Sequence, residues 1–246
     1  MLHCPVKWSE LSEEQLRYTL MLIGSGLYSE VEVRTMMLIR LCGITVIKKH
    51  AGGFWSCSVT LDTGKVHHFD LQTWQIHDMI SQLAFVNAPE DMDVRLERIG
   101  EYRAVNALLH GLAFMDYLNL EACYQGYLVT RKQGRVEAMA RILYRDEEGN
   151  MPDRLEPDIA EITGTLFWFY HVKKVFAKVF PNFFRPVNGT GEHDHLAAFN
   201  AQIRALTDGD VTKEKEIKGI DCWRCLTELD AKAREAEEFK RKYGNK

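Results

Sequence analysis

The sequence lacks the short motifs that identify the commonest enzyme classes. It contains no phosphate-binding P-loop, no glycine-rich dinucleotide fingerprint, no nucleophile elbow and no H-E-x-x-H pair. It also lacks a second C-x-x-C and an H-x3-5-H pair, which would complete the ligand set of a structural zinc site. We therefore expect a protein without enzymatic activity and without a cofactor.

A broad excess of positive charge and a long uninterrupted apolar run are missing as well. Lys and Arg number 31 against 35 Asp and Glu, a net charge of -4, so nucleic-acid binding would need a local patch. The most apolar stretch, residues 162–180, contains three lysines that would be costly at bilayer depth. The first residues show no basic segment followed by an apolar core, and we expect no secretory signal. The sequence thus predicts a cytoplasmic protein that does not enter a membrane.

The cysteines are too widely scattered to form a dense disulfide framework. The six cysteines are scattered over 246 residues, unlike the dense frameworks of small secreted domains. With 46% hydrophobic residues, the chain can bury a core without disulfide or metal cross-links. We expect reduced thiols.

Two helix-start signals open the chain. Ser12 with Gln15 three residues later, and Ser29 with Glu32, each match a capping box. Gly43, after the second apolar run, is typical of a left-handed residue at a helix end. These signals predict two short helices in a hairpin.

The pattern then changes to short runs rich in β-branched and aromatic residues. Such runs fill residues 44–71 and are separated by Gly52-Gly53 and by a turn at 62–64. They predict a small antiparallel meander. A helix follows, and residues 87–103 show only a weak pattern and are interpreted as a connection.

Three apolar helical patterns occupy the middle of the chain. The first runs from 108 to 128, where Gly111 and Gly126 could interrupt it, and the second covers 136–143. The third, around 162–180, is apolar over most of its circumference, which is typical of a helix in the middle of a bundle.

These patterns together predict a mainly α fold. We expect a helical bundle with a small antiparallel β-meander inserted at about 44–71 and an amphipathic helical arm at the C-terminus. The predicted division is a domain over 1–205 and an arm over 206–246, because the composition becomes polar and rich in charge near residue 205.

A C-x-x-C pair in the arm has the spacing of zinc sites and of dithiol redox centres. Cys222 and Cys225 would need two further zinc ligands, and the nearest candidates are His193 and His195. A redox pair is expected at the N-terminus of a helix that follows a strand; Asp221 could cap such a helix, but the sequence predicts no strand before it. A metal-dependent or thiol-dependent activity at this pair is kept as an alternative.

The same segment carries one apolar stripe at three- and four-residue steps, which explains more of its residues. An arm with this stripe must pack on its own body or on another chain. We predict that Trp223, Leu226, Leu229 and Phe239 bind a protein partner or a second copy. The whole stripe consists of Ile220, Trp223, Leu226, Leu229, Ala233, Ala236, Phe239 and Tyr243.

Cations interleaved with aromatic residues give a second alternative, a nucleic-acid-binding accessory factor. Lys173, Lys174, Lys178 and Arg185 lie within the run FWFYHVKKVFAKVFPNFFR. The aromatic spacing is helical, however, and favours a buried core helix over a base-stacking platform.

Three segments in the second half of the chain carry a resemblance. NLEACYQGYLVTRK, FWFYHVKKVFAKVFPNFF and IRALTDGDVTKEKEIKGIDCWRCLTELDAKAREAEE are similar to an uncharacterised family encoded in prophages and other mobile elements of gut anaerobes. The resemblance includes no catalytic motif and transfers no functional residue. It implies a phage-related protein of tail or head assembly, acting through protein interaction.

Overall fold

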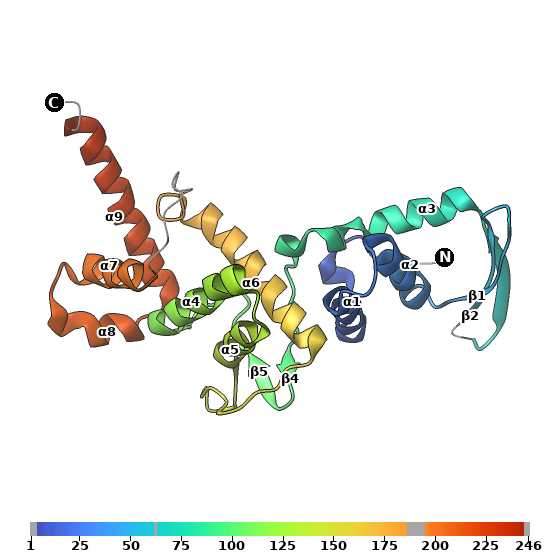
Figure 1. Cartoon of the computed structure of the whole chain (residues 1–246), viewed down its shortest axis with the longest axis horizontal. Helices are drawn as coiled ribbons and strands as arrows, with labels where there is room; N and C mark the ends of the chain where they lie inside the picture. The colour runs from blue at the N-terminus through green and yellow to red at the C-terminus, as the bar shows by residue number, and fades with distance from the viewer. Residues whose placement is uncertain (1–3, 62, 186–194, 244–246) are drawn as a thin grey trace. The chain divides into compact units, whose positions relative to one another are not determined.

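The computed structural model describes residues 4–61, 63–185 and 195–243 (Figure 1). Within these residues the chain is mainly helical and has two small three-stranded antiparallel sheets, which confirms the predicted fold class. Among the described helices, none combines the length and the apolarity that a membrane span requires.

The chain divides into two compact units that are discontinuous in sequence. Unit 1 comprises Met1–Glu97 and Pro157–Trp168, and unit 2 comprises Arg98–Glu156 and Phe169–Lys246. The boundary expected near residue 205 falls inside unit 2. The division into a domain over 1–205 and an arm over 206–246 stays a prediction.

In unit 1, helices α1 (Glu13–Ser25) and α2 (Glu30–Leu41) begin at the predicted capping boxes. The Ser12 hydroxyl accepts a hydrogen bond from the Gln15 N–H at 3.3 Å, and the Gln15 side chain accepts one from the Ser12 N–H at 2.9 Å. The same reciprocal pair starts α2. Gly26 ends α1 with a left-handed φ of 63°, which glycine adopts without steric cost.

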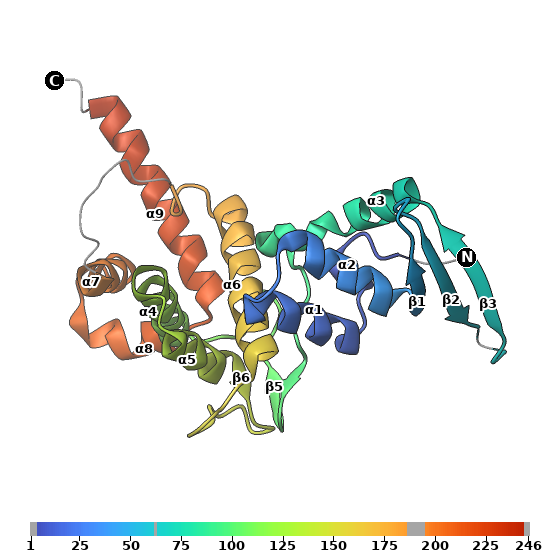
Figure 2. The same cartoon turned by 45° about the vertical axis from the view of Figure 1, so that its right-hand side comes forward.

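The predicted meander follows α2 and is confirmed. Its strands pair antiparallel in the order β1-β2-β3, and α3 comes next in the chain (Figure 2). Ile44, Cys57 and Leu71 are buried on its inner face, as alternation along a half-buried sheet requires. The elements are β1 (Ile44–Lys49), β2 (Trp55–Thr60), β3 (Val66–Leu71) and α3 (Thr73–Gln82).

The interpretation of residues 87–103 as a plain connection is wrong. Two short strands in this region, β4 and β5, pair with each other, and β5 pairs with the later β6 to make the second sheet. Strands of two or three residues are too short to show alternation in a sequence. The short elements are η1 (Trp8–Glu10), η2 (Leu83–Asn87), η3 (Pro89–Asp91), β4 (Arg98–Ile99), β5 (Tyr102–Ala104) and β6 (Tyr144–Arg145).

Helix α6 (Ile159–Val179) contributes to both units. In unit 1 it packs closely on α1: a Cβ at Gly164 would lie 3.0 Å from the Leu20 side chain, so only glycine fits without displacement. Arg17 of α1 also pairs with Glu161 of α6 at 2.8 Å. These contacts hold the beginning of α6 against unit 1.

The remaining helices belong to unit 2. The predicted helix over 108–128 begins later than expected, because the chain turns at Gly111 with a φ of 80° before α4 starts. Gly126 does not interrupt α4, and its missing side chain leaves room for Arg135 of α5. The elements are α4 (Phe114–Thr130), α5 (Gln133–Leu143), α7 (His195–Thr207), η4 (Val211–Lys213), α8 (Glu214–Gly219) and α9 (Cys222–Tyr243).

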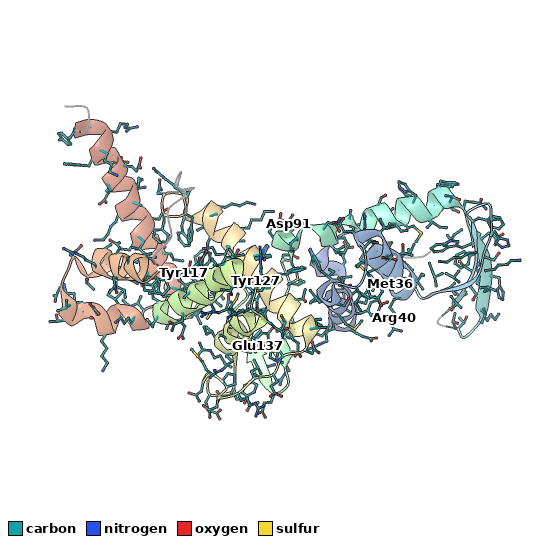
Figure 3. All side chains as sticks on the ribbon, viewed as in Figure 1. Met36, Arg40, Asp91, Tyr117, Tyr127 and Glu137 are labelled. Carbon is teal, nitrogen blue, oxygen red and sulfur yellow. The ribbon has the colours of Figure 1, made fainter. Side chains whose placement is uncertain are left out.

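The second part of α6 supplies much of the core of unit 2. Phe169, Val172 and Phe176 are fully buried, as the apolar circumference of this helix predicted. Phe176 contacts Tyr117 of α4, which Figure 3 labels, with ring centroids 5.8 Å apart. This core is the surface on which α9 begins.

Candidate functional site

Helix α9 begins at a well-defined cap beside the C-x-x-C pair. The Asp221 carboxylate accepts hydrogen bonds from the N–H groups of Trp223 at 2.8 Å and Arg224 at 3.3 Å. Asp221 also forms an isolated antiparallel bridge with Ala113. The predicted cap is therefore present, and a single bridge residue, rather than a strand, precedes it.

The two thiols have little exposure to solvent. Cys222 and Cys225 are buried, and the Cys222 Sγ lies 3.3 Å from the Leu109 carbonyl oxygen, to which it donates. Burial, followed by the negative charge of Asp221, raises the pKa of Cys222 to about 12 and that of Cys225 to about 11. Both thiols are thus protonated at neutral pH, whereas nucleophilic and metal-binding cysteines need the thiolate.

A metal site at this pair gains no ligands from the described residues. Nowhere in the ranges 4–61, 63–185 and 195–243 do three or more His, Cys, Asp or Glu side chains come together as a metal would require. His193 and the His195 side chain, the candidates from the sequence, lie outside what the structure describes.

The first half of α9 packs on the body of unit 2. The Trp223 ring stacks on His110 with centroids 4.2 Å apart and meets Phe176 and Phe180 edge-on, each at 5.3 Å. Leu226 is fully buried and Leu229 is 4% exposed. Leu226 and Leu229 were predicted to bind a partner, but side chains of unit 2 itself cover them.

A carboxylate fixes the middle of α9 to the turn that follows α6. Asp230 accepts hydrogen bonds from the backbone N–H groups of Asn182 at 2.7 Å and Phe183 at 2.9 Å, and from the Asn182 amide at 2.9 Å. Burial opposes ionisation of Asp230, but these hydrogen bonds outweigh it and lower the pKa of the carboxyl group. These three hydrogen bonds, which we call the Asp230 clamp, hold the middle of α9 to this turn.

Beyond three further half-buried residues, 231–233, the helix is exposed on every side. All residues from 234 to 243 are exposed, including Phe239 at 65% and Tyr243 at 54%. The two rings contact each other with centroids 4.8 Å apart. In Figure 1 and Figure 3 these last turns extend past α7 and α8. We name residues 234–243 the helix tip.

The helix tip presents one mixed face. At about 100° per residue, Glu235, Ala236, Lys242 and Tyr243 all lie within about 60° of the direction of Phe239. The aromatic rings of Phe239 and Tyr243 thus lie beside a small residue, Ala236. The acidic Glu235 and the basic Lys242 lie on the same face. The Lys242 ammonium lies 5.4 Å from the Tyr243 ring centroid.

The candidate nucleic-acid cations do not form a free basic surface. Lys173 pairs with Glu121 at 2.8 Å, and both side chains are mostly covered. Arg185 pairs with Glu237 of α9, also at 2.8 Å. Lys174 is half-buried and Lys178 is exposed. Because two of the four charges are neutralised by carboxylates, the structure adds no support to this alternative.

Sequence reasoning identified the stripe of α9 but missed how it divides. The signal was available in part, because alanines at 233 and 236 interrupt the large apolar residues of the stripe after Leu229. The Asp230 clamp gave no signal, since an aspartate on the flank of a helix is ordinarily solvated.

Comparisons with known proteins identify no relative of this chain. Neither a protein-family model, nor a curated protein, nor a solved structure matches the chain.

Proposed function

We propose that the chain is a non-enzymatic assembly protein whose copies join through the helix tip. The observation that carries this proposal is the contrast in exposure: α9 buries Leu226 in its first half and leaves Phe239 65% exposed in its second. Most helical stability in proteins comes from the packing of an apolar face, and the face of the helix tip is not packed. A partner surface would supply the missing burial.

The face of the helix tip is complementary to itself in an antiparallel arrangement. When two tips cross with their Phe239 rings facing, residues three or four positions before Phe239 in one copy meet the residues three or four positions after it in the other copy that lie on the same side of the helix. Ala236 of one copy then faces Tyr243 of the other, so that a large ring lies over a small residue. Glu235 faces Lys242 of the second copy in the same way.

The charges favour a second copy over an unrelated apolar partner. Two Glu235–Lys242 pairs would flank the aromatic centre on one side, and the pairing would set both the direction and the register. A parallel arrangement would instead place Glu235 beside Glu235 and Lys242 beside Lys242. The antiparallel pair is therefore the arrangement for which the sequence of the tip is suited.

The expected association is weak. Stable interfaces typically bury about 1,600 Å² in total, and three turns of helix on each side provide less than that. Weak contacts of this kind suit assembly, where several copies held close together gain avidity. The resemblance to prophage-encoded proteins supports a place for this assembly in the cytoplasm, during formation of a phage tail or head.

The test measures mass in solution by sedimentation velocity over a wide range of concentrations. We expect the wild-type chain to form a dimer at high concentration, and the double variant Phe239→Ser, Tyr243→Ser to stay monomeric. Val129→Ala removes another exposed apolar side chain, 79% exposed on α4, and serves as the matched control. Deleting the whole arm would be a poorer test, because it removes the buried Leu226.

A charge exchange distinguishes this arrangement from nonspecific adhesion. Glu235→Lys should weaken the dimer, because it places a second positive charge against Lys242 of the other copy. Adding Lys242→Glu to that variant should restore the dimer with the charges exchanged. A wild-type chain that stays monomeric at all concentrations, or a dimer insensitive to both substitutions, would contradict the proposal; binding of the tip to a different protein would then have to be sought.

A further inference from the structure

An open cavity lies in unit 2, beside the buried first half of α9. Its walls come from the end of α7, from α8 and from the beginning of α9 (Figure 1). Its volume of about 430 Å³ is within the range of about 300–1,000 Å³ that small-molecule sites occupy. We name it the α8 cavity, and its lining residues are Leu206, Ile217, Ile220, Arg224, Cys225, Thr227 and Glu228.

The junction between α8 and α9, which forms part of the wall, is fixed by backbone hydrogen bonds. The Phe114 N–H donates to the Ile220 carbonyl oxygen at 2.8 Å, and the Cys222 N–H donates to the Leu112 carbonyl oxygen, also at 2.8 Å. These bonds tie the wall to the beginning of α4 and the turn before it. The cavity is therefore largely formed before any ligand enters, which lowers the entropic cost of binding.

Most of the lining is apolar. Leu206, Ile217 and Ile220 are half-buried, and Cys225 is buried with its sulfur 3.9 Å from the Ile217 carbonyl oxygen, to which it donates. The large apolar side chains of this lining are branched and aliphatic. Such walls favour an aliphatic chain, because hydrophobic stabilisation grows with the apolar area that is removed from water.

Among the described residues, the polar part of the lining leaves one positive charge without a carboxylate partner. The Arg224 guanidinium forms no ion pair in the described parts of the chain. Glu228, in contrast, lies 4.0 Å from Lys232, and the Thr227 hydroxyl donates to the Trp223 carbonyl oxygen at 2.8 Å. Arg224 is therefore the group that is suited to bind an anionic head group, for which its planar N–H donors match a carboxylate.

The charge of Arg224 acts on the wall of the cavity. Burial, followed by the negative charge of Asp221, raises the pKa of Cys225, and the Arg224 guanidinium opposes this increase. The positive charge is thus felt at a side chain that lines the same space.

We propose that the α8 cavity binds a small aliphatic carboxylic acid. Its carboxylate accepts hydrogen bonds from the Arg224 guanidinium, and its chain lies against Leu206, Ile217 and Ile220. This inference does not depend on the helix tip, because all of the lining residues precede residue 234.

The experiment adds octanoate, below its micellar concentration, to the full-length chain at neutral pH and follows carbon-13-labelled isoleucine methyl groups by NMR. The signals of Ile217 and Ile220 are assigned from the variants Ile217→Val and Ile220→Val. We expect these two signals to shift in a saturable way and those of Ile44 and Ile76, in unit 1, to stay in place. Acetate, which lacks the chain, and octanol, which lacks the charge, should each bind at least about tenfold more weakly.

Three variants test the role of charge. Arg224→Gln should weaken octanoate binding at least about tenfold, because it removes hydrogen bonds between charged groups, and the exposed position of Arg224 should let the variant fold. Glu228→Gln should strengthen binding, since it removes a negative charge from the lining. Lys215→Gln is the matched control, because Lys215 is an exposed cation of α8 outside the described lining, and it should leave the affinity unchanged.

Three results would overturn the proposal. The first is a wild-type chain whose Ile217 and Ile220 signals do not respond to octanoate. The second is octanol that binds as tightly as octanoate, and the third is an Arg224→Gln variant that keeps the wild-type affinity.

Discussion

The two halves of α9 carry one continuous apolar stripe but have opposite surroundings. Both carry apolar residues at helical spacing, yet Leu226 is fully buried while Phe239 is 65% exposed. The first half meets a surface formed by α4 and the end of α6, and the second half extends past it. A continuous apolar stripe therefore indicates that a helix can bury one face, but the length of the surface beneath decides how much of that face is covered.

The largest expected contrast between the halves is in thiol alkylation. Cys225 is buried with its pKa raised to about 11, so iodoacetamide should modify it only when unit 2 opens. An Ala236→Cys variant places a thiol in the exposed tip, where we expect modification at least about 1,000 times faster at neutral pH. Peptide mapping separates these thiols from Cys4 and Cys123. Comparable rates would mean that the first half of α9 is not held as observed.

Truncating the buried half should cost much more stability than truncating the tip. Leu226→Ala removes a fully buried side chain from the interface with the body, and we expect a loss of about 2–5 kcal/mol in the free energy of unfolding. Denaturant unfolding followed by circular dichroism measures this loss. A change below about 0.5 kcal/mol, typical of a surface position, would show that α9 does not pack there.

The Asp230 clamp, between the two halves of α9, predicts that the free energy of unfolding depends on pH. Because the pKa of Asp230 is lowered in the folded chain, its ionised form stabilises the fold above the unfolded pKa near 3.9, and this contribution is lost as pH falls through the folded pKa. We expect Asp230→Asn to cost about 1 kcal/mol at pH 7, since solvent near the carboxylate weakens its hydrogen bonds.

The measurement compares the unfolding free energies of wild type and Asp230→Asn from pH 7 down to pH 3. Other carboxylates with lowered pKa values, such as Asp208, titrate in both proteins, so the difference between the curves isolates Asp230. The difference should shrink as the wild-type carboxylate becomes protonated. A difference that is constant across this range would indicate that the clamp is not electrostatic.

The smallest expected effect is on the stability of the tip itself. Phe239→Ala removes a ring that contacts Tyr243 and solvent, so the unfolding free energy of dilute, monomeric protein should change by no more than about 0.5 kcal/mol. The same substitution should still weaken association at high concentration. A large loss of stability in dilute solution would place Phe239 in a packed environment.

The two cysteine pairs show that spacing in the sequence does not by itself indicate the chemistry of a thiol. Cys222 and Cys225 have a spacing that suggests chemistry, but both are buried and the pKa of each thiol is raised. Cys4 and Cys42 have no spacing that any pattern would select, yet a hydrogen bond from Cys42 lowers the pKa of the Cys4 thiol. The chemistry of a thiol depends on its neighbours in space, and a short motif reports only its neighbours in the chain.

The features that could be predicted from the sequence depend on local interactions. The capping boxes at Ser12 and Ser29, the meander over 44–71 and the start of α9 at Asp221 each involve hydrogen bonds or alternation within a few residues. The sheet that joins β4 and β5 to β6 could not be predicted, because residues far apart in the chain must pair before it exists. The covered half of α9 could not be predicted either, since it depends on a surface contributed by distant segments.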